Sequence, residues 1–241
     1  MTNLFGEFLG TAVLMLLGCG VCANVTLKNS KAEGGGWIVV TAGWAFAVVL
    51  GVFTAVSLGA PNADLNPAVT LARTMAGLYT IEQAIFTMIV ELAGGIVGAA
   101  IVWLAFLPHW ELTDNKAAKL GVFCTAPQVR NSVANLTCEI IATAMLMLAF
   151  FAMGAKPVGA IPAGVGPYLA GIVVWSIGLS LGGPTGYAIN PARDLGPRIA
   201  HAILPIAGKG GSDWSYAWIP VVGPLVGGGI AYVIAKVGGI L

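Results

Sequence analysis

The feature that most restricts the fold of this chain is a series of six long apolar segments. A transmembrane helix needs about 20 consecutive apolar residues, and each segment is close to that length. Only 9% of the 241 residues are charged, whereas a soluble domain carries about 25%, so the chain cannot coat a water-facing surface. We therefore expect an all-α membrane protein with six transmembrane helices. The expected spans are Leu4–Ala23, Trp37–Leu58, Ala84–Leu107, Val133–Met153, Gly166–Leu181 and Tyr216–Val237.

Two further segments, Pro61–Tyr79 and Gly183–Ile203, are apolar but broken by glycine and proline. Their unbroken parts are too short to span a bilayer. Irregular backbone at membrane depth persists only where protein buries it or where it lines a water-filled cavity. We therefore expect two re-entrant half-helices beside such a cavity, over Ala68–Leu78 and Ala192–Ala202.

The two halves of the chain repeat each other. The matched pairs are Glu7-Phe-Leu-Gly-Thr-Ala with Glu139-Ile-Ile-Ala-Thr-Ala, Asn66-Pro-Ala with Asn190-Pro-Ala, and Gly94–Gly98 with Gly223–Gly227. Each half holds three spans, an odd number, so the second copy must be inverted in the membrane. Broken segments at matched positions of an inverted repeat point to a permeation or binding site. We expect one channel domain over residues 1–241, made of repeat one (1–107), a connector (108–132) and repeat two (133–241).

Each Asn-Pro-Ala triplet has the chemistry of a helix start. Asparagine is a strong N-cap residue, proline suits the first helical turn, and the helix N-terminus carries about half a positive charge. Inverted symmetry aims both helix starts at the centre of the bilayer, where Asn66 and Asn190 offer N–H donors to a permeant. Such a lumen conducts neutral solutes and repels protons and cations. One Asn-Pro-Ala alone is an ordinary helix start, but two matched copies favour a pore.

On these residues, the chain resembles the aquaporin family along essentially its whole length. Asn66-Pro67-Ala68-Val69-Thr70 and Asn190-Pro191-Ala192-Arg193 resemble the signature turns of that family, and Asp194 resembles a marker of its glycerol-facilitator branch. The resemblance implies six tilted spans plus two half-helices, and a homotetramer with one pore in each subunit. It also implies a multi-pass cell-membrane protein with cytoplasmic termini, no metal, no cofactor and no enzymatic activity.

The resemblance places an outer selectivity filter at four residues. Arg193 matches the arginine that donates hydrogen bonds to the permeant, and an arginine in an apolar segment is usually functional. Asp194, the next residue, could orient this arginine or cap the helix start, where the helix dipole favours a carboxylate. Gly178 stands where water-selective members have histidine, so it removes a donor and leaves room for a carbon backbone. Tyr187 stands where a glycerol facilitator is expected to have phenylalanine, and its hydroxyl should narrow or polarise the filter. Trp44 resembles the filter tryptophan, but its spacing from the first signature turn is slightly long, which leaves Phe46 as the alternative and core packing as another role for Trp44.

In the family, backbone carbonyls just before each signature turn line the lumen. Here those carbonyls would belong to Asn62, Ala63 and Asp64 in the first half, and to Gly186, Tyr187 and Ala188 in the second. Asp64 departs from the family, in which many members have histidine at that position. It is either a carboxylate that adds field against anions near the inner mouth or a solvated loop acid.

Two glutamates and two cysteines leave a choice of roles. We expect Glu7 and Glu139 to hold the re-entrant loops by accepting backbone N–H bonds, and the alternative role is proton relay. Cys19 and Cys22 form a CxxC pair, but a redox pair needs a different structural context, so we expect them to pack as small apolar residues. No chemical role is expected for three residues of the connector, His109, Trp110 and Cys124.

The sequence therefore predicts a passive channel in a lipid bilayer for glycerol, water and other small neutral polar solutes, including short hydroxy acids in their neutral form. A proton-coupled secondary transporter is the alternative, because inverted repeats with broken helices also serve that class. A formal net charge of +1 leaves no basic field for nucleic acid.

The expected topology conflicts with the positive-inside rule, which favours basic residues in cytoplasmic loops. Only Arg73, Lys156 and Lys236 would face the cytoplasm. The basic residues that would face outward are Lys28, Lys31, Lys116, Lys119, Arg130, Arg193, Arg198 and Lys209.

Overall fold

The computed structural model describes residues 3–241, and within that range the chain is helical and contains no strand. Five of its helices are long and apolar enough to cross a membrane, and α8 is a shorter apolar helix of 16 residues. All six expected spans are therefore helices. They are α1 (Leu4–Thr26), α2 (Trp37–Ser57), α4 (Ile81–Ala105), α7 (Ser132–Met153), α8 (Gly166–Leu181) and α10 (Ile219–Val237).

The observed ends differ from the expected ones by a few residues because capping groups set them. Helix α4 begins three residues before the apolar run, since Thr80 and Gln83 form a capping box. Helix α7 begins after Asn131, whose side chain accepts a hydrogen bond from the Ala134 N–H. Helix α10 begins at Ile219, three residues later than expected, after a turn that contains Tyr216.

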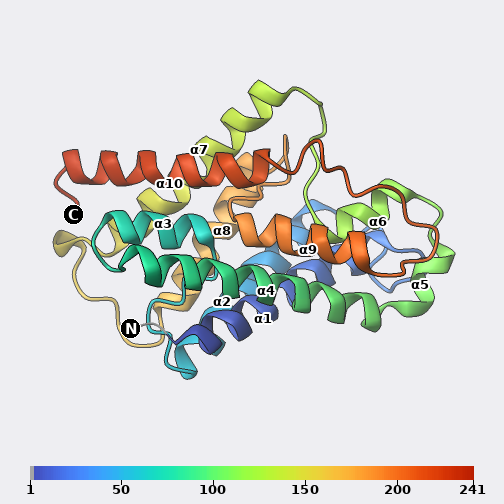
Figure 1. Ribbon diagram of the computed structural model, residues 1–241, viewed down its shortest axis with the longest axis horizontal. Coiled ribbons are helices and arrows are strands. Elements are labelled where there is room, and N and C mark those ends of the chain that lie inside the picture. Colours follow the sequence, from blue (N-terminus) through green and yellow to red (C-terminus); the bar gives the residue numbers. More distant parts are fainter. Residues whose placement is uncertain (1–2) are drawn as a thin grey trace.

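Two half-helices enter the bundle from opposite ends, as expected. Helix α3 spans Pro67–Met75 and α9 spans Pro191–Ile203, and both are too short to cross a bilayer. Figure 1 shows them in the middle of the bundle, pointing toward each other. The segment between the third and fourth spans folds into two short helices, α5 (Leu107–Leu112) and α6 (Lys116–Phe123). A single turn, Lys156–Val158, follows α7.

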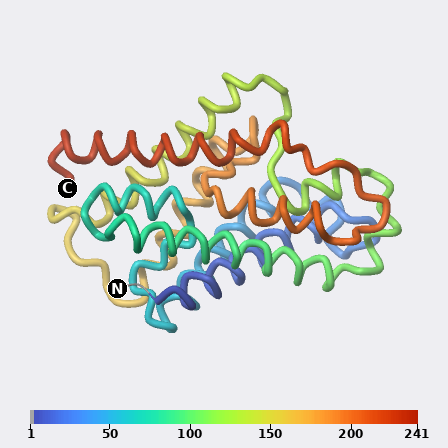
Figure 2. The backbone as a smooth tube through the Cα atoms, viewed as in Figure 1, coloured from blue at the N-terminus to red at the C-terminus, as the bar shows by residue number. Residues whose placement is uncertain are grey.

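Glycines at matched positions allow the spans to cross closely. A Cβ atom on Gly98 of α4 would lie 2.3 Å from the carbonyl oxygen of Ala12 in α1, and one on Gly227 of α10 would lie 2.4 Å from the carbonyl oxygen of Ile140 in α7. Small residues at such crossings are typical of membrane helix pairs. The tube in Figure 2 shows α1 beside α4 and α7 beside α10. The repeated glycine-rich stretches therefore mark the same crossing in each half.

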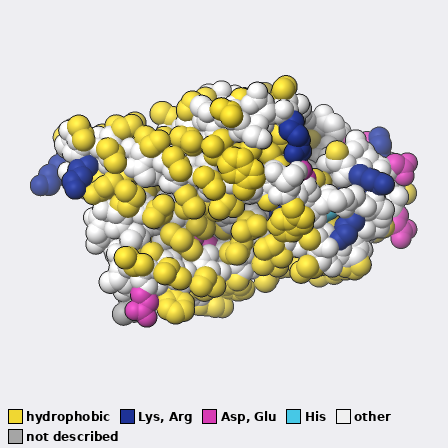
Figure 3. Space-filling model, turned by 45° about the horizontal axis from the view of Figure 1, so that its top comes forward, with side chains coloured by type: hydrophobic (Ala, Val, Ile, Leu, Met, Phe, Trp, Pro, Cys, Tyr) yellow, Lys and Arg dark blue, Asp and Glu magenta, His cyan; other side chains and the backbone are white. Residues whose placement is uncertain are grey.

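The outer surface suits a lipid environment. Figure 3 shows hydrophobic side chains over the middle of one face, with charged side chains mainly toward the two ends of the molecule. Large apolar residues are exposed along the spans, such as Ile89 on α4 and Val233 on α10. In water such a surface would aggregate, whereas in lipid it matches the solvent. The start of α1 and the end of α10 lie at the same end of the molecule (Figure 1).

Candidate functional site

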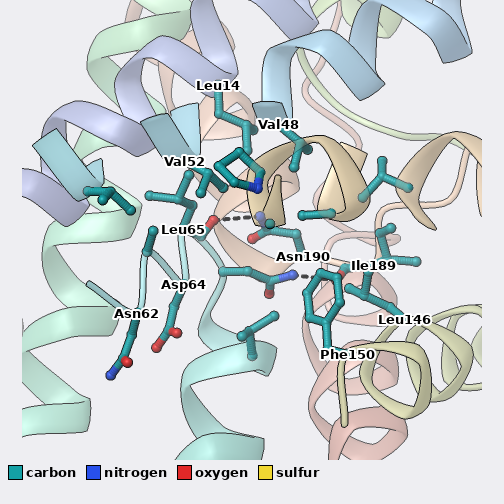
Figure 4. Close-up of a pocket in the computed structure, with 18 of the residues that line it drawn as sticks. Leu14, Val48, Val52, Asn62, Asp64, Leu65, Leu146, Phe150, Ile189 and Asn190 are labelled. Atoms are coloured by element: carbon teal, nitrogen blue, oxygen red, sulfur yellow. Dashed lines mark hydrogen bonds between the residues drawn. The ribbon is translucent and has the colours of Figure 1, made fainter. Parts of the chain in front are cut away.

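Two asparagines join the half-helices at the centre of the molecule. The Nδ2 amide of Asn66 donates to the carbonyl oxygen of Ile189 at 2.9 Å, and that of Asn190 donates to the carbonyl oxygen of Leu65 at 2.7 Å (Figure 4). Each asparagine Oδ1 accepts from the backbone N–H two residues further on, that of Ala68 or Ala192. Both amides are thus oriented by their own helix start and by the opposite turn.

The turn that leads into each half-helix is held in a strained backbone conformation. Ala63 and Leu65 have φ values of 43° and 52°, and the matched residues Tyr187 and Ile189 have φ values of 39° and 45°. A non-glycine residue in this left-handed region costs about 1–3 kcal/mol and persists only where its surroundings enforce it. The turns before the two half-helices, which match in sequence, therefore also share the same strained backbone conformation.

Two buried glutamates enforce that conformation. Glu7 accepts from the backbone N–H groups of Asp64 at 3.2 Å and Leu65 at 3.0 Å. Glu139 accepts from the N–H groups of Ala188 at 3.0 Å and Ile189 at 2.9 Å. Each carboxylate thus satisfies two buried donors that the strained turn cannot pair within itself.

A third glutamate, missed in the sequence analysis, holds only the first turn. Glu91 of α4 is buried, and its Oε1 accepts from the Asn66 N–H at 2.9 Å and from the Thr70 hydroxyl at 3.0 Å. The second half has no matching glutamate: the offset that pairs Gly94 with Gly223 places Pro220 at the position of Glu91. A search for repeated residues could not find it, although a charged residue within a span is itself a signal.

The half-helices dock on glycines of the third and sixth spans. A Cβ atom on Gly95 would lie 2.8 Å from the carbonyl oxygen of Ala192, and one on Gly228 would lie 2.9 Å from that of Ala68. The first turn of each half-helix therefore rests directly against the backbone of a span. This contact fixes the depth at which the two asparagines meet.

A cavity of about 400 Å³ runs past both asparagines. Residues from both halves line it (Figure 4). They include five of the six asparagine and filter positions expected from sequence. Gly178 and Gly186 do not line it, whereas the other lumen residues do. The expected residues found on the wall are Trp44, Asn62, Ala63, Asp64, Asn66, Tyr187, Ala188, Asn190 and Arg193.

Arg193 and Trp44 lie together at one end of this cavity. The guanidinium carbon of Arg193 is 3.9 Å from the centre of the Trp44 ring, and its Nη1 donates to the carbonyl oxygen of Phe123 at 3.2 Å. Both side chains are buried. Phe46, the alternative to Trp44, is 59% exposed on the outside of α2. Of the two candidates, only Trp44 reaches the cavity.

Helix α1 forms the support for Trp44. The indole N–H donates to Cys22 Sγ at 3.3 Å, and a Cβ atom on Gly18 would lie 2.2 Å from the indole ring. Cys19, one turn before Cys22, contacts the carbonyl oxygen of Phe123. Both cysteines are free thiols in buried positions, and no metal-ligating cluster exists among residues 3–241. The CxxC pair is thus part of the packing around the arginine and the tryptophan.

The Tyr187 ring lies in the space beside Gly178, where the sequence predicts room for a solute. A Cβ atom on Gly178 would lie 2.8 Å from the Tyr187 ring, and one on Gly182 would lie 2.6 Å from it. Trp37 packs edge-on against the same ring and donates to the Gly178 carbonyl oxygen at 3.0 Å. The tyrosine therefore takes the volume that the two glycines leave. Its hydroxyl oxygen is buried and has no hydrogen-bond partner.

Asp64 is neither a solvated loop acid nor an unbalanced charge at the inner mouth. Its side chain is fully buried, forms an ion pair with Arg73, and accepts from the Thr70 hydroxyl at 2.9 Å. Arg73 also donates to the carbonyl oxygen of Asn62 at 2.6 Å. The positive charge of Arg73 balances Asp64, so the carboxylate adds little net field against anions.

Asp194, expected as a subtype marker that could also orient Arg193 or cap the helix, contacts the connector and α9. It is fully buried and accepts from the Thr125 N–H at 2.7 Å and the Thr125 hydroxyl at 2.6 Å. Arg198, one turn later in α9, donates to the other oxygen of Asp194 at 2.8 Å. The connector is thus joined to the second half-helix through Thr125 and through the Phe123 carbonyl.

Charged groups also hold the loop between α9 and α10, at the same end of the molecule as Arg198. Lys209 donates to three carbonyl oxygens at the end of α9, those of His201, Ala202 and Leu204, and burial lowers its pKa. Burial by itself raises the pKa of Asp213, but hydrogen bonds from Arg130 and Ser215 outweigh it and hold that pKa below its usual value. These contacts fix the loop between α9 and α10.

Comparisons with known proteins agree with this geometry. The sequence profile of the family described as "Major intrinsic protein" matches residues 1–235. A probable glycerol uptake facilitator protein of Thermotoga maritima is 50% identical over 228 residues, which are 95% of this chain and 95% of that protein. A D/L-lactic acid transporter of Lactiplantibacillus plantarum is 40% identical over 234 residues, which are 95% of this chain and 94% of that protein. The aquaglyceroporin of Plasmodium falciparum has a similar structure, with a TM-score of 0.82 and 26% identity over 97% of this chain and 94% of that chain.

Proposed function

This chain belongs to the major intrinsic protein family, the aquaporins and glycerol facilitators, and on that premise we propose that it is a passive membrane channel for glycerol, water and other small neutral solutes. It lies in the cell membrane and is not an enzyme. The observation that carries this function is the reciprocal pairing of Asn66 and Asn190 on the wall of one cavity built from both halves.

The asparagine pair supports conduction of neutral solutes. The Oδ1 atoms of Asn66 and Asn190 are occupied by their own helix starts, so the amides act toward a permeant only as donors. One Nδ2 hydrogen of each goes to the opposite turn, and the other remains for the lumen. A water molecule that accepts both is oriented against proton relay, and a cation meets two helix N-termini.

The outer end of the cavity supports selection of polyols. Trp44 and Tyr187 line the cavity as apolar side chains that can contact carbon–hydrogen groups, and Arg193 offers hydrogen-bond donors to hydroxyls. Carbonyls of the strained turns, which include those of Asn62 and Ala188, continue the polar side of the path. Arg193 and Trp44 are in direct contact, with 3.9 Å between the guanidinium carbon and the ring centre, so little space is left beside them. We therefore expect unbranched polyols to pass and bulky ones to be rejected.

The geometry disfavours the proton-coupled alternative. A coupling acid must take up and release a proton, yet Glu7 and Glu139 each use both carboxylate oxygens to accept backbone N–H groups of the turns. Protonation would remove acceptors that the strained turns need. We therefore expect uptake to be independent of an imposed pH gradient.

Proteoliposome shrinkage followed by stopped-flow light scattering tests the function directly. In an impermeant sugar we expect fast shrinkage, and in glycerol we expect fast shrinkage followed by fast reswelling with and without a pH gradient. Empty liposomes provide the control. Reswelling no faster than in empty liposomes would exclude a glycerol channel, and reswelling that requires the pH gradient would support the transporter.

A second solute class is supported by the unpartnered Tyr187 hydroxyl and by the 40% identity to a D/L-lactic acid transporter. A short hydroxy acid in its neutral form has the size and hydroxyl pattern of a polyol. Its flux should follow the neutral fraction and fall as the pH rises above the pKa of the acid. Equal fluxes well above and well below that pKa would contradict this assignment.

Family membership also supports a homotetramer embedded in lipid. Apolar side chains exposed on α2 and α8, such as Leu50 and Leu179, offer surface for a second copy or for acyl chains. Native mass spectrometry from mild detergent should give a mass four times that of the 24.5 kDa chain. A single-chain mass under the same conditions would contradict the tetramer.

A further inference from the structure

The guanidinium of Arg193 is held by a segment that belongs to neither repeat. Its Nη1 donates to the carbonyl oxygen of Phe123, the last residue of α6 in the connector. The Trp44 ring covers one face of the guanidinium but offers it no acceptor. The position of the Phe123 carbonyl therefore limits where Arg193 can point its remaining donors.

Thr125, two residues after Phe123, is attached to α9 by all three of its hydrogen-bonding groups. Its N–H and hydroxyl donate to Asp194 Oδ2 at 2.7 Å and 2.6 Å, and its carbonyl oxygen accepts from Arg198 Nη2 at 2.9 Å. Asp194 and Arg198 are also paired with each other at 2.8 Å, and the side chains of both are fully buried. Hydrogen bonds to charged partners in a buried site are among the stronger ones in proteins.

Two consecutive residues of α9 thus contact the same short segment. Arg193 binds it at Phe123, and Asp194 binds it at Thr125. Helix α9 therefore supplies both the arginine at the cavity and the attachment of the segment that restrains this arginine. A shift of Thr125 relative to α9 would carry the Phe123 carbonyl with it, because only Cys124 separates them.

We propose that Asp194 is a positioning residue for solute selection, acting through Thr125 and the Phe123 carbonyl on the orientation of Arg193. This inference rests on the proposed function, in which Arg193 forms the filter. Asp194 itself does not line the cavity. Its effect is transmitted by the segment 123–125. Arg198 supports this arrangement because it binds both Asp194 and the carbonyl oxygen of Thr125.

The test compares variants of Thr125 that keep or remove one hydrogen bond. Thr125→Ser keeps the hydroxyl that Asp194 accepts, whereas Thr125→Val keeps the shape and the backbone N–H but leaves Asp194 without its 2.6 Å partner. Arg130→Gln is the matched control, because it breaks an exposed ion pair with Asp213 at the same end of the molecule. Each variant is reconstituted as the full chain in proteoliposomes.

The readout is the ratio of glycerol to water permeability of the same vesicles. This ratio divides out the number of folded channels, so a variant that merely folds less well lowers both permeabilities and leaves the ratio unchanged. We expect Thr125→Val to change the ratio by about threefold or more, because a buried charged acceptor has lost one of its hydrogen bonds next to the segment that restrains Arg193. Thr125→Ser and Arg130→Gln should leave it near the wild-type value.

Each outcome decides the inference. An unchanged ratio in Thr125→Val, with wild-type glycerol conduction intact, overturns the positioning role while leaving the channel function in place. Failure of the wild type to conduct glycerol overturns the proposed function instead. Should Thr125→Val not assemble, Thr125→Ala removes the same hydroxyl with less bulk. If both variants fail to assemble while Thr125→Ser does, the bond serves assembly alone and the positioning role is rejected.

Discussion

At the scale of single residues, the proposed filter depends on the position of the Tyr187 ring. Tyr187 occupies the volume beside Gly178 and Gly182, and Trp37 supports it from the outside. A glycine in place of histidine therefore does not by itself widen the path, because a neighbouring side chain moves into the space. The same arrangement leaves the Tyr187 hydroxyl buried and without a partner.

Gly178→Ala tests the packing of that ring. The added methyl group would lie 2.8 Å from the Tyr187 ring and 3.0 Å from Thr41, so the ring must shift toward the lumen. We expect glycerol permeability to fall by about tenfold, the effect of one extra carbon in a tight pocket, with a smaller loss for water. Stopped-flow measurement of both solutes checks this, and an equal loss for both would indicate misfolding instead.

Tyr187→Phe tests the unpartnered hydroxyl. A buried hydroxyl without a hydrogen bond costs about 1–3 kcal/mol, so its removal should leave the thermal stability in detergent unchanged or raise it, while glycerol still passes. A clear loss of stability would mean that the hydroxyl has a partner in the membrane. Neutral lactic acid flux, measured on the same variant, shows whether the hydroxyl also contacts the solute.

At the scale of elements, each half-helix is positioned by backbone contacts with a span. Gly95 and Gly228 admit the carbonyls of Ala192 and Ala68, and crossings at Gly98 and Gly227 bring the spans together. In lipid, helices associate through such close packing because apolar burial gives no advantage there. The glycines of α4 and α10 therefore determine the positions of the asparagines.

Gly227→Val should disrupt the crossing of α7 and α10. Any Cβ atom at this position would lie 2.4 Å from the Ile140 carbonyl oxygen, and overpacking of this kind costs about 1–3 kcal/mol or more. We expect a reduced yield of folded protein by size-exclusion chromatography. Gly20→Ala in α1 is the control, since nothing lies within 4 Å of its added Cβ atom. Equal yields from both variants would contradict the role of the crossing.

At the scale of the whole molecule, basic residues at the expected outer end bind acidic side chains and backbone carbonyls. These contacts give a structural reason why more basic residues lie at that end than at the other. Arg198 binds Asp194, Arg130 binds Asp213, Lys28 binds Glu33, and Lys209 binds the end of α9. Lys119, almost fully buried, binds the carbonyl oxygen of Ala207. Most outward basic residues therefore have a partner in the folded protein. The positive-inside rule considers only the number of basic residues in each loop and takes no account of such partners.

The Arg130–Asp213 pair should make a small, pH-dependent contribution to stability. The pKa of Asp213 is lowered in the folded protein, so its stabilising effect is present above its unfolded pKa and is lost as the pH falls through the folded value. Because Arg130 is exposed, we expect less than about 1 kcal/mol at neutral pH. Thermal unfolding of wild type and Asp213→Asn should differ slightly at pH 7 and converge in acid. A difference that grows in acid would contradict this sign.

The sequence by itself determined the membrane class, the six spans, the inverted repeat and the two asparagine turns. These follow from local properties: apolar length, helix-capping chemistry and matched residues such as Glu7 and Glu139. Helix ends also follow from sequence to within a few residues, because caps such as Thr80 with Gln83 set them.

Only the tertiary structure decided how side chains from distant segments pack around the proposed filter. Gly178 and Tyr187 are nine residues apart, yet their contact depends on how α8 returns beside the second turn. The sequence does not show that Arg73 forms an ion pair with Asp64. It also does not show that Thr125 of the connector donates a hydrogen bond to Asp194. Local preference fixes which helices form, whereas burial and charge pairing are properties of contacts between segments, and these exist only after the segments have packed.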